Sequence, residues 1–344
     1  RSGDVGTSAY AYLNKEGGKH AVGQLELEYE SRKLDYNDLG YNQRSNDVRW
    51  WTQLEYRELE RWGPLLESHA RFEYFGRRNL DNLPIGGGYQ LNIEGKFSNF
   101  WKAFTEVHWR PTWFDDREVG DGTALQRAGL VGHEVELATD PTRRVSFKTF
   151  VQTQKTSNGF IQSGDAGVLF RVLPQFDFEV LPTWIYTFGE PRFAAVAAPG
   201  EYVFGRLNAK SIGAVLRTTY TFTPRLTLQA YGQLFLASGH YSDFTSVSSD
   251  PNGSRPVARL SDLRAFTGTL PTNPDFQQGV LNTSVVLRWE YMLGSTLFLV
   301  YTRSQSPAVI LAAGEEGHLS FTSVRRAPAA DVIMAKLTYW WASR

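Results

Sequence analysis

The sequence predicts an all-β protein, specifically a transmembrane antiparallel β-barrel, on three observations. Apolar and polar residues alternate with a period of two, the pattern of a strand with two different faces. The alternating stretches run for about ten residues, the length that crosses a bilayer at a tilt. Short turns alternate with long connections along the chain, as in outer-membrane barrels. A soluble β-sandwich also alternates, but its strands are usually shorter and its connections follow no such rule.

The composition supports this fold class. Aromatic residues make up 14% of the chain, with 22 Phe, 16 Tyr and 10 Trp, yet the mean hydropathy is −0.35. A membrane barrel needs this combination because only alternate residues meet lipid, while aromatic girdles mark both interfaces. No apolar run approaches the roughly 18–20 residues of a membrane-spanning helix, so a helical membrane protein is excluded.

The first clear stretch illustrates the pattern. Leu25 and Leu27 alternate with Glu26, Glu28 and Glu30, so one face is apolar and the other is charged. Similar stretches predict strands, in chain order, at residues 5–14, 20–30, 48–61, 66–77, 88–97, 101–113, 128–138, 145–155, 160–172, 176–188, 210–222, 226–238, 280–291, 295–304 and 331–341.

Turn residues such as Trp62-Gly63-Pro64 separate some strands, whereas other connections are long. The longest, 239–279 and 305–330, are expected to be external loops able to fold over the barrel mouth, and segment 201–209 to prolong its strand. The expected strand number is odd, and single-chain bacterial barrels have even numbers. We therefore expect residues 1–344 to be one barrel domain, the C-terminal part of a longer protein that supplies a further strand. No signal peptide is visible at the start.

The charged face is the candidate lining of the barrel lumen. It either wets a pore or rigidifies the wall by cross-strand pairing, and the mixed signs favour pairing. The candidate lumen-lining residues are Glu26, Glu28, Glu55, Arg57, His69, Arg71, Glu73, Glu94, Lys96, Glu106, His108, Arg110, Glu134, Glu136, Arg171, Glu179, Arg288 and Glu290.

The opposite face is expected to meet lipid. Leu25, Phe72, Val180, Leu287 and Leu337 should therefore lie opposite the charged set. The candidate lipid-facing or girdle aromatics are Trp101, Trp109, Trp113, Trp184, Trp289, Tyr291, Tyr339 and Trp341.

Several function classes are excluded or disfavoured. Net charge is zero, with 36 basic and 36 acidic residues, so nothing points to nucleic acid as a partner. Cysteine is absent, which removes disulfides and thiol chemistry. His69 and His108 lie in ladders of charges with no serine obviously placed beside them for nucleophilic attack, so we expect no enzyme and no catalytic residue. Acidic residues in loop 239–279, including segment 250–254, do not follow a calcium-loop spacing, and we expect no metal and no cofactor.

Two apolar stretches, 194–198 and 308–313, lie inside long connections. Each is either packed beneath the loops or a docking surface for a partner, and both readings remain open.

Six segments carry a resemblance to a known family: LDYNDLGY (34–41, followed by Arg44 and Asp47), YVFGRL (202–207), YTFTPRL (220–226), VLRWEY (286–291), GSTLFLVY (294–301) and KLTYWW (336–341). Together they resemble the C-terminal barrel region of a bacterial outer-membrane family of unknown function, whose members begin with a carbohydrate-binding domain of the family 9 type. The resemblance implies an outer-membrane barrel and a longer protein. The carbohydrate-binding domain is absent from this chain, so carbohydrate binding does not carry over, and the family supplies no catalytic residues.

These observations predict a protein of the bacterial outer membrane. A gated or plugged pore is the expected function, and a structural or anchoring barrel that holds a partner or displays loops is the alternative. The expected partners are outer-membrane lipid and lipopolysaccharide, the barrel-insertion machinery, and either a partner protein or an upstream plug. The final strand, with Leu337, Tyr339 and Trp341 alternating, resembles an insertion signal.

Overall fold

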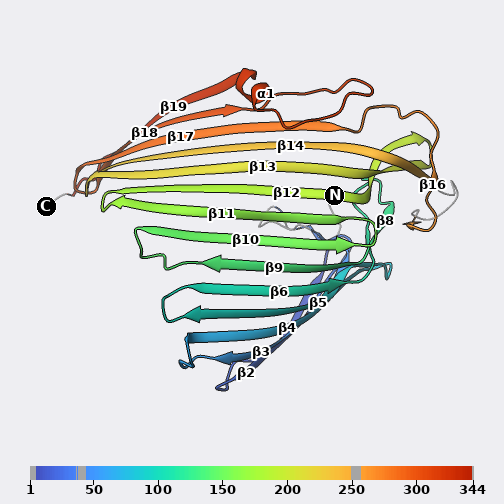
Figure 1. Cartoon of the computed structure of the whole chain (residues 1–344), viewed down its shortest axis with the longest axis horizontal. Helices are drawn as coiled ribbons and strands as arrows, with labels where there is room; N and C mark the ends of the chain where they lie inside the picture. Colours follow the sequence, from blue (N-terminus) through green and yellow to red (C-terminus); the bar gives the residue numbers. More distant parts are fainter. Residues whose placement is uncertain (1–4, 36, 38–43, 249–256, 343–344) are drawn as a thin grey trace.

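The computed structural model describes residues 5–35, 37, 44–248 and 257–342, which form an all-β fold with one short helix (Figure 1). The elements are β1 (Ser8–Lys15), β2 (Ala21–Glu30), β3 (Asp47–Glu58), β4 (Leu65–Asn79), β5 (Pro84–Phe97), β6 (Lys102–Arg110), β7 (Trp113–Asp115), β8 (Ala124–Arg127), β9 (Leu130–Ala138), β10 (Val145–Thr156), β11 (Phe160–Leu173), β12 (Phe176–Ala198), β13 (Glu201–Thr223), β14 (Leu226–Ser248), β15 (Val257–Ala258), β16 (Arg264–Ala265), β17 (Phe276–Met292), β18 (Ser295–Gln305), α1 (Phe321–Arg326) and β19 (Ala329–Thr338).

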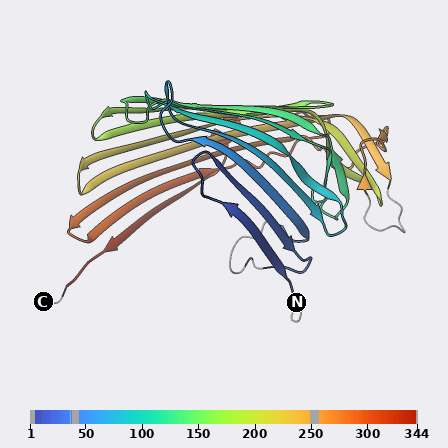
Figure 2. The ribbon, with the colours of Figure 1, turned by 90° about the horizontal axis from the view of Figure 1, so that it is seen from below.

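The main sheet has sixteen strands, of which β16 pairs only with β14, so fifteen follow one another from β1 to β19. Every neighbouring pair in this order is antiparallel. The sheet curves into an arch with β1 and β19 at its two ends (Figure 2). The predicted all-β class and large antiparallel sheet are therefore confirmed. Within the described residues no pairing joins β1 to β19, so the sheet is open rather than a closed barrel.

Each strand expected from the alternation corresponds to one strand of this sheet, but three of them are much longer than expected. β12, β13 and β14 each run for 23 residues. The connection expected at 189–200 is therefore mostly strand, and the one expected at 239–279 begins ten residues late. Segment 201–209 extends β13 as expected. We call residues 189–198, 201–208 and 239–248 the far ends of these strands.

A three-stranded sheet of β7, β8 and β15 lies beside the far ends. Its buried residues form an apolar cluster with those of β13: Leu125, Tyr202, Phe204 and Ala258. We call residues 113–127, which contain β7 and β8, the cap hairpin. The cap hairpin lies in the connection between β6 and β9. It folds back over the main sheet instead of extending away from it as a loop.

Helix α1 packs on the apolar face of the main sheet. Its Val324 is fully buried, and a Cβ at Gly279 of β17 would meet both Val324 and Leu236 of β14. The Gln305 amide donates to the carbonyl of Ala327 at 2.9 Å. Connection 305–330 thus folds onto the apolar face of β14, β17 and β18.

The described residues contain no helix with both the length and the apolar content for a membrane span. Segment 250–254, considered above for calcium, lies outside the described residues, as do residues 36 and 38–41 of the first resemblance motif.

Candidate functional site on the concave face

Strand register sorts the two sets of predicted residues onto opposite faces of the main sheet. Residues directly opposite in antiparallel strands lie on the same face. One such row runs from Glu55 to Arg71, Asn92, Glu106 and Glu134, across β3, β4, β5, β6 and β9. All the predicted charged residues fall on this face.

The opposite face carries the apolar residues. Leu54 pairs with Phe72, Leu91 with Val107, and Leu228 with Leu287. The predicted aromatics Trp109, Trp184, Trp289 and Tyr291 belong to this face.

Four predicted aromatics lie outside the main sheet. Trp113 belongs to β7 of the small sheet, and the guanidinium of Arg127 stacks over its ring at 5.8 Å. The prediction that Trp113 ends a strand of the main sheet was therefore wrong, because β6 already ends at Arg110. Trp101 precedes β6, and Tyr339 and Trp341 follow β19.

The charged face is the hollow side of the arch, because the cap hairpin spans it. Asp116 of the cap hairpin accepts two hydrogen bonds from Arg44 at 2.6 Å and one from Asn79 of β4 at 3.4 Å. At its other end the hairpin contacts β12 and β13. A segment that reaches both places crosses the concavity, where Asn79 shares a face with the charged rows.

Cross-strand ion pairs cover much of this concave face. Glu55 contacts both His69, at 2.7 Å from Nδ1, and Arg71, at 3.4 Å from Nε. Arg71 continues to Glu94 at 3.1 Å. Arg171 of β11 lies 3.8 Å from Asp177 of β12, and Glu179 of β12 lies 3.7 Å from Lys148 of β10. The mixed signs seen in the sequence thus correspond to paired charges.

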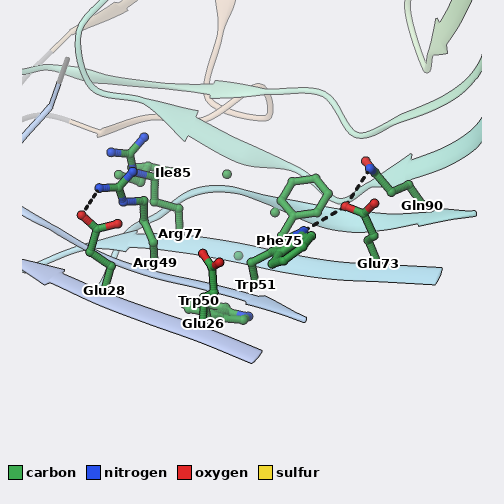
Figure 3. Close-up of a pocket in the computed structure, with 13 residues that line it drawn as sticks. Glu26, Glu28, Arg49, Trp50, Trp51, Glu73, Phe75, Arg77, Ile85 and Gln90 are labelled. Carbon is green, nitrogen blue, oxygen red and sulfur yellow. Dashed lines mark hydrogen bonds and ion pairs between the residues drawn. The ribbon is translucent and has the colours of Figure 1, made fainter. Parts of the chain in front are cut away.

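A pocket of 530 Å³ opens on the concave face between β2 and β5 (Figure 3). Arg49 joins Glu28 at 2.6 Å on one side, and Arg77 is paired with Asp47. Trp51 lies toward the other side, as Figure 3 shows. The pocket has the size of a small-molecule site and offers charged and aromatic groups together.

Glu73, which lines this pocket, is held by neutral donors. Its carboxylate accepts from Trp51 Nε1 at 2.9 Å, Gln90 Nε2 at 3.0 Å and Asn92 Nδ2 at 3.1 Å. Three hydrogen bonds satisfy the buried carboxylate, which fixes its position in the wall.

The cap hairpin is fastened to β12 by a buried charge network. Arg127 donates to both carboxylate oxygens of Glu190, at 2.7 and 2.6 Å, and to Glu118 at 2.5 Å. Glu118 also accepts from Arg192 at 2.7 Å. Bidentate guanidinium–carboxylate pairs of this kind fix geometry strongly.

Two aspartates of the cap hairpin have pKa values below the ordinary range. Burial acts to raise the pKa of Asp116, but the hydrogen bonds and charge of Arg44 outweigh it. Burial likewise opposes a low pKa at Asp121, where hydrogen bonds from Tyr202 and Thr123 dominate. The Tyr202 hydroxyl donates to Asp121 at 2.6 Å. Both carboxylates are therefore tied down in their charged form.

Sequence reasoning did not identify several residues of this site. Arg49, Trp51 and Arg77 extend the alternation of β3 and β4, so the same period would have placed them on the charged face. Arg127 and Glu190 carried no local signal, because the contact joins residues 63 positions apart.

A family described as a domain of unknown function, DUF5916, matches residues 1–341 of the chain. No curated protein and no solved structure matches it.

Proposed function

The chain belongs to the DUF5916 family, and from this premise and its two-faced sheet we propose that it is an outer-membrane β-barrel whose aqueous interior is closed by the cap hairpin. It would act as a gated or plugged pore. The proposal includes the resemblance to outer-membrane barrels that follow a carbohydrate-binding domain of the family 9 type.

The inverted distribution of residues between the two faces carries the proposal. Large apolar side chains are exposed on the convex face, including Leu54 at 61% and Val107 at 51%. The concave face holds charged and amide groups, among them Glu73, Asn92 and His108, that are buried. A soluble sheet buries its apolar face, whereas a membrane barrel presents it to lipid. β2, β6 and β9, at nine or ten residues, have the length for one crossing.

Barrel closure requires a further strand. Because fifteen strands alternate in direction, β1 and β19 run the same way and do not form an antiparallel pair with each other. Both strands are exposed edges, and Ile333 of β19 is 83% exposed. A strand inserted between them, from a preceding segment or another chain, would complete an even-numbered barrel.

Membrane facing is tested by a matched pair in β17. Leu287→Arg places a charge on the convex face and should cost roughly 2–4 kcal/mol at the bilayer midplane. Arg288→Gln, on the concave face, should cost much less. The free energy of folding into lipid vesicles is measured for both variants. Equal losses would contradict the assignment of the convex face to lipid.

Conductance in planar bilayers tests the plug. The intact chain should conduct weakly, and replacing residues 113–127 by a short Gly/Ser linker should raise the conductance strongly. A large, steady conductance of the intact chain would overturn the plugged state. The alternative, an anchoring barrel without transport, rests on the ion pairs that rigidify the wall, and it predicts no conductance even without the hairpin.

Assembly is a further part of the proposal. The barrel-insertion machinery would recognise the final strand, and the mature barrel would contact outer-membrane lipid and lipopolysaccharide. Deletion of residues 336–344 should abolish membrane insertion, while normal insertion of the truncated chain would argue against this role. No catalytic residue is proposed, because the His69 and His108 imidazoles bond to carboxylates of the wall.

A further inference from the structure

Three groups able to bind a metal meet in the wall between β6 and β9. Glu106 and Glu134 are directly opposite each other, and His108 lies two residues along β6 on the same face. One potential ligand atom from each residue lies within 4.8 Å of the other two. His108 Nδ1 is 2.9 Å from Glu106 Oε1.

The two carboxylates face each other without a cationic side chain. Among the described residues, no lysine or arginine forms an ion pair with Glu106 or Glu134, in contrast to Glu55 in the same row. Gln152 donates to Glu134 at 2.8 Å, but an amide brings no charge. Like charges directly opposite in a sheet are destabilising, so this arrangement favours a bound cation.

His108 is fixed in place by its surroundings. Its side chain is 1% exposed and lies flat over Gly132 of β9, where any Cβ would overlap the imidazole. Gln154 Nε2 lies 3.3 Å from His108 Nε2, on the side of the ring away from Glu106. A metal-binding histidine usually donates its second ring N–H to an oxygen acceptor, and a Gln154 amide turned by 180° would present its oxygen to Nε2.

A fourth group lies beside the cluster with an unused acceptor. Asn92 is directly opposite Glu106 on β5 and is 4% exposed. Its Nδ2 donates to Glu73 at 3.1 Å, while its Oδ1 has no hydrogen-bond partner in the part of the chain that the structure describes. A buried acceptor without a partner is costly, and a cation or its bound water would satisfy it.

We propose that Glu106, His108 and Glu134 bind a divalent transition-metal cation of the Zn²⁺ type, with the Asn92 carbonyl oxygen beside it. One imidazole nitrogen with carboxylate oxygens suits Zn²⁺, whereas Ca²⁺ and Mg²⁺ prefer oxygen ligands alone. The cation neutralises the facing carboxylates and joins β6 to β9 at the base of the segment that carries the cap hairpin. This inference stands whether or not the barrel conducts.

Calorimetric titration of the full chain, folded in detergent, with ZnCl₂ tests the site. The wild type should bind one Zn²⁺ per chain, and MgCl₂ should give no saturable binding. His108→Gln and Glu134→Gln should each weaken Zn²⁺ binding by more than about tenfold. Gly132→Ala should also weaken binding, because it displaces the imidazole while leaving every ligand present.

His69→Gln is the matched control. His69 also bonds to a carboxylate on the concave face, at 2.7 Å, but that carboxylate is already neutralised by Arg71. Zn²⁺ affinity should be unchanged in this variant. The inference is overturned if the wild type shows no saturable binding, or if His69→Gln loses as much affinity as His108→Gln. Circular dichroism establishes folding of each variant, and Glu134→Gln, which keeps the side-chain shape, decides if His108→Gln does not fold.

Discussion

The short-stranded wall and the far ends of β12 to β14 are built on different principles. In the wall, formed by β2 to β6 and β9, strands of nine to fifteen residues bury charges against each other on the concave face. At the far ends, Tyr202, Val203 and Phe204 are buried in succession, although they alternate between the two faces of β13. Burial on both faces of a strand requires cover on both sides, and the small sheet supplies it on the face of Tyr202 and Phe204.

Strand length therefore has two different causes in this protein. The strands of the wall follow their two-faced pattern to within a few residues at each end. The far ends continue for about ten more residues because packed side chains make strand preferable to loop there. The cap hairpin is therefore as much a support for the long strands as a cover for the concave face.

Phe204→Ala should have the largest effect, confined to the far ends. Phe204 is fully buried in the apolar cluster, and removing a buried Phe side chain costs about 3–5 kcal/mol. Hydrogen exchange of the amides at 201–208 should accelerate by two to three orders of magnitude or more, while the amides of β3 to β6 keep their rates. Equal acceleration in both regions would show that they are one cooperative unit.

Arg127→Met should come next, because it leaves Glu118 and Glu190 buried without their shared cation. Breaking a buried pair in this way costs about 3 kcal/mol or more. Exchange in the cap hairpin should rise more than exchange at the far ends, since the apolar cluster persists. Unchanged exchange in residues 113–127 would mean that the charge network does not hold the hairpin.

Acid should loosen the cap hairpin to an intermediate degree. The folded pKa values of Asp116 and Asp121 lie below their ordinary values. Their stabilisation is therefore present above the unfolded pKa, about 3.9, and is lost as pH falls through the lower folded values. The protection factors of the hairpin amides, which correct for the slower intrinsic exchange in acid, should be lower at pH 3 than at pH 7, and Asp121→Asn should reduce this difference. A pH-independent hairpin would exclude these two carboxylates as its attachment.

Arg217→Met should have the smallest effect. Arg217 reaches Glu179 on the concave face at 3.3 Å, but its side chain is 56% exposed. An exposed pair contributes about 0–1 kcal/mol. Urea unfolding of this variant in vesicles should overlap the wild-type curve within that amount. A loss as large as that of Arg127→Met would remove the contrast between exposed and buried pairs.

The sequence by itself determined the wall. A period of two fixes which residues share a face, so Leu54, Phe72 and Val107 could be assigned opposite Arg71 and Glu106 before any fold was known. The turn residues fixed most hairpins, because a short antiparallel connection leaves little freedom of register. Fifteen strands, an odd number, followed from the same pattern.

Only the tertiary structure decided the far ends and the cap. The stretch 194–198 showed apolar character but no partner, and Ala195 became buried within β12. Trp113 continued the apparent alternation of β6 but turned into a second sheet. Such contacts join segments far apart in the chain, and local periodicity carries no information about them.

The candidate metal cluster shows the same division. Glu106 and His108 share a face through their spacing of two, which the sequence displays. Glu134 comes opposite Glu106 only because β6 pairs with β9 in one register, across a connection that leaves the sheet to form the cap hairpin. A shift of that pairing by one residue would turn Glu134 to the other face. Alternation thus fixed which side chains face inward, and long-range pairing decided which of them meet.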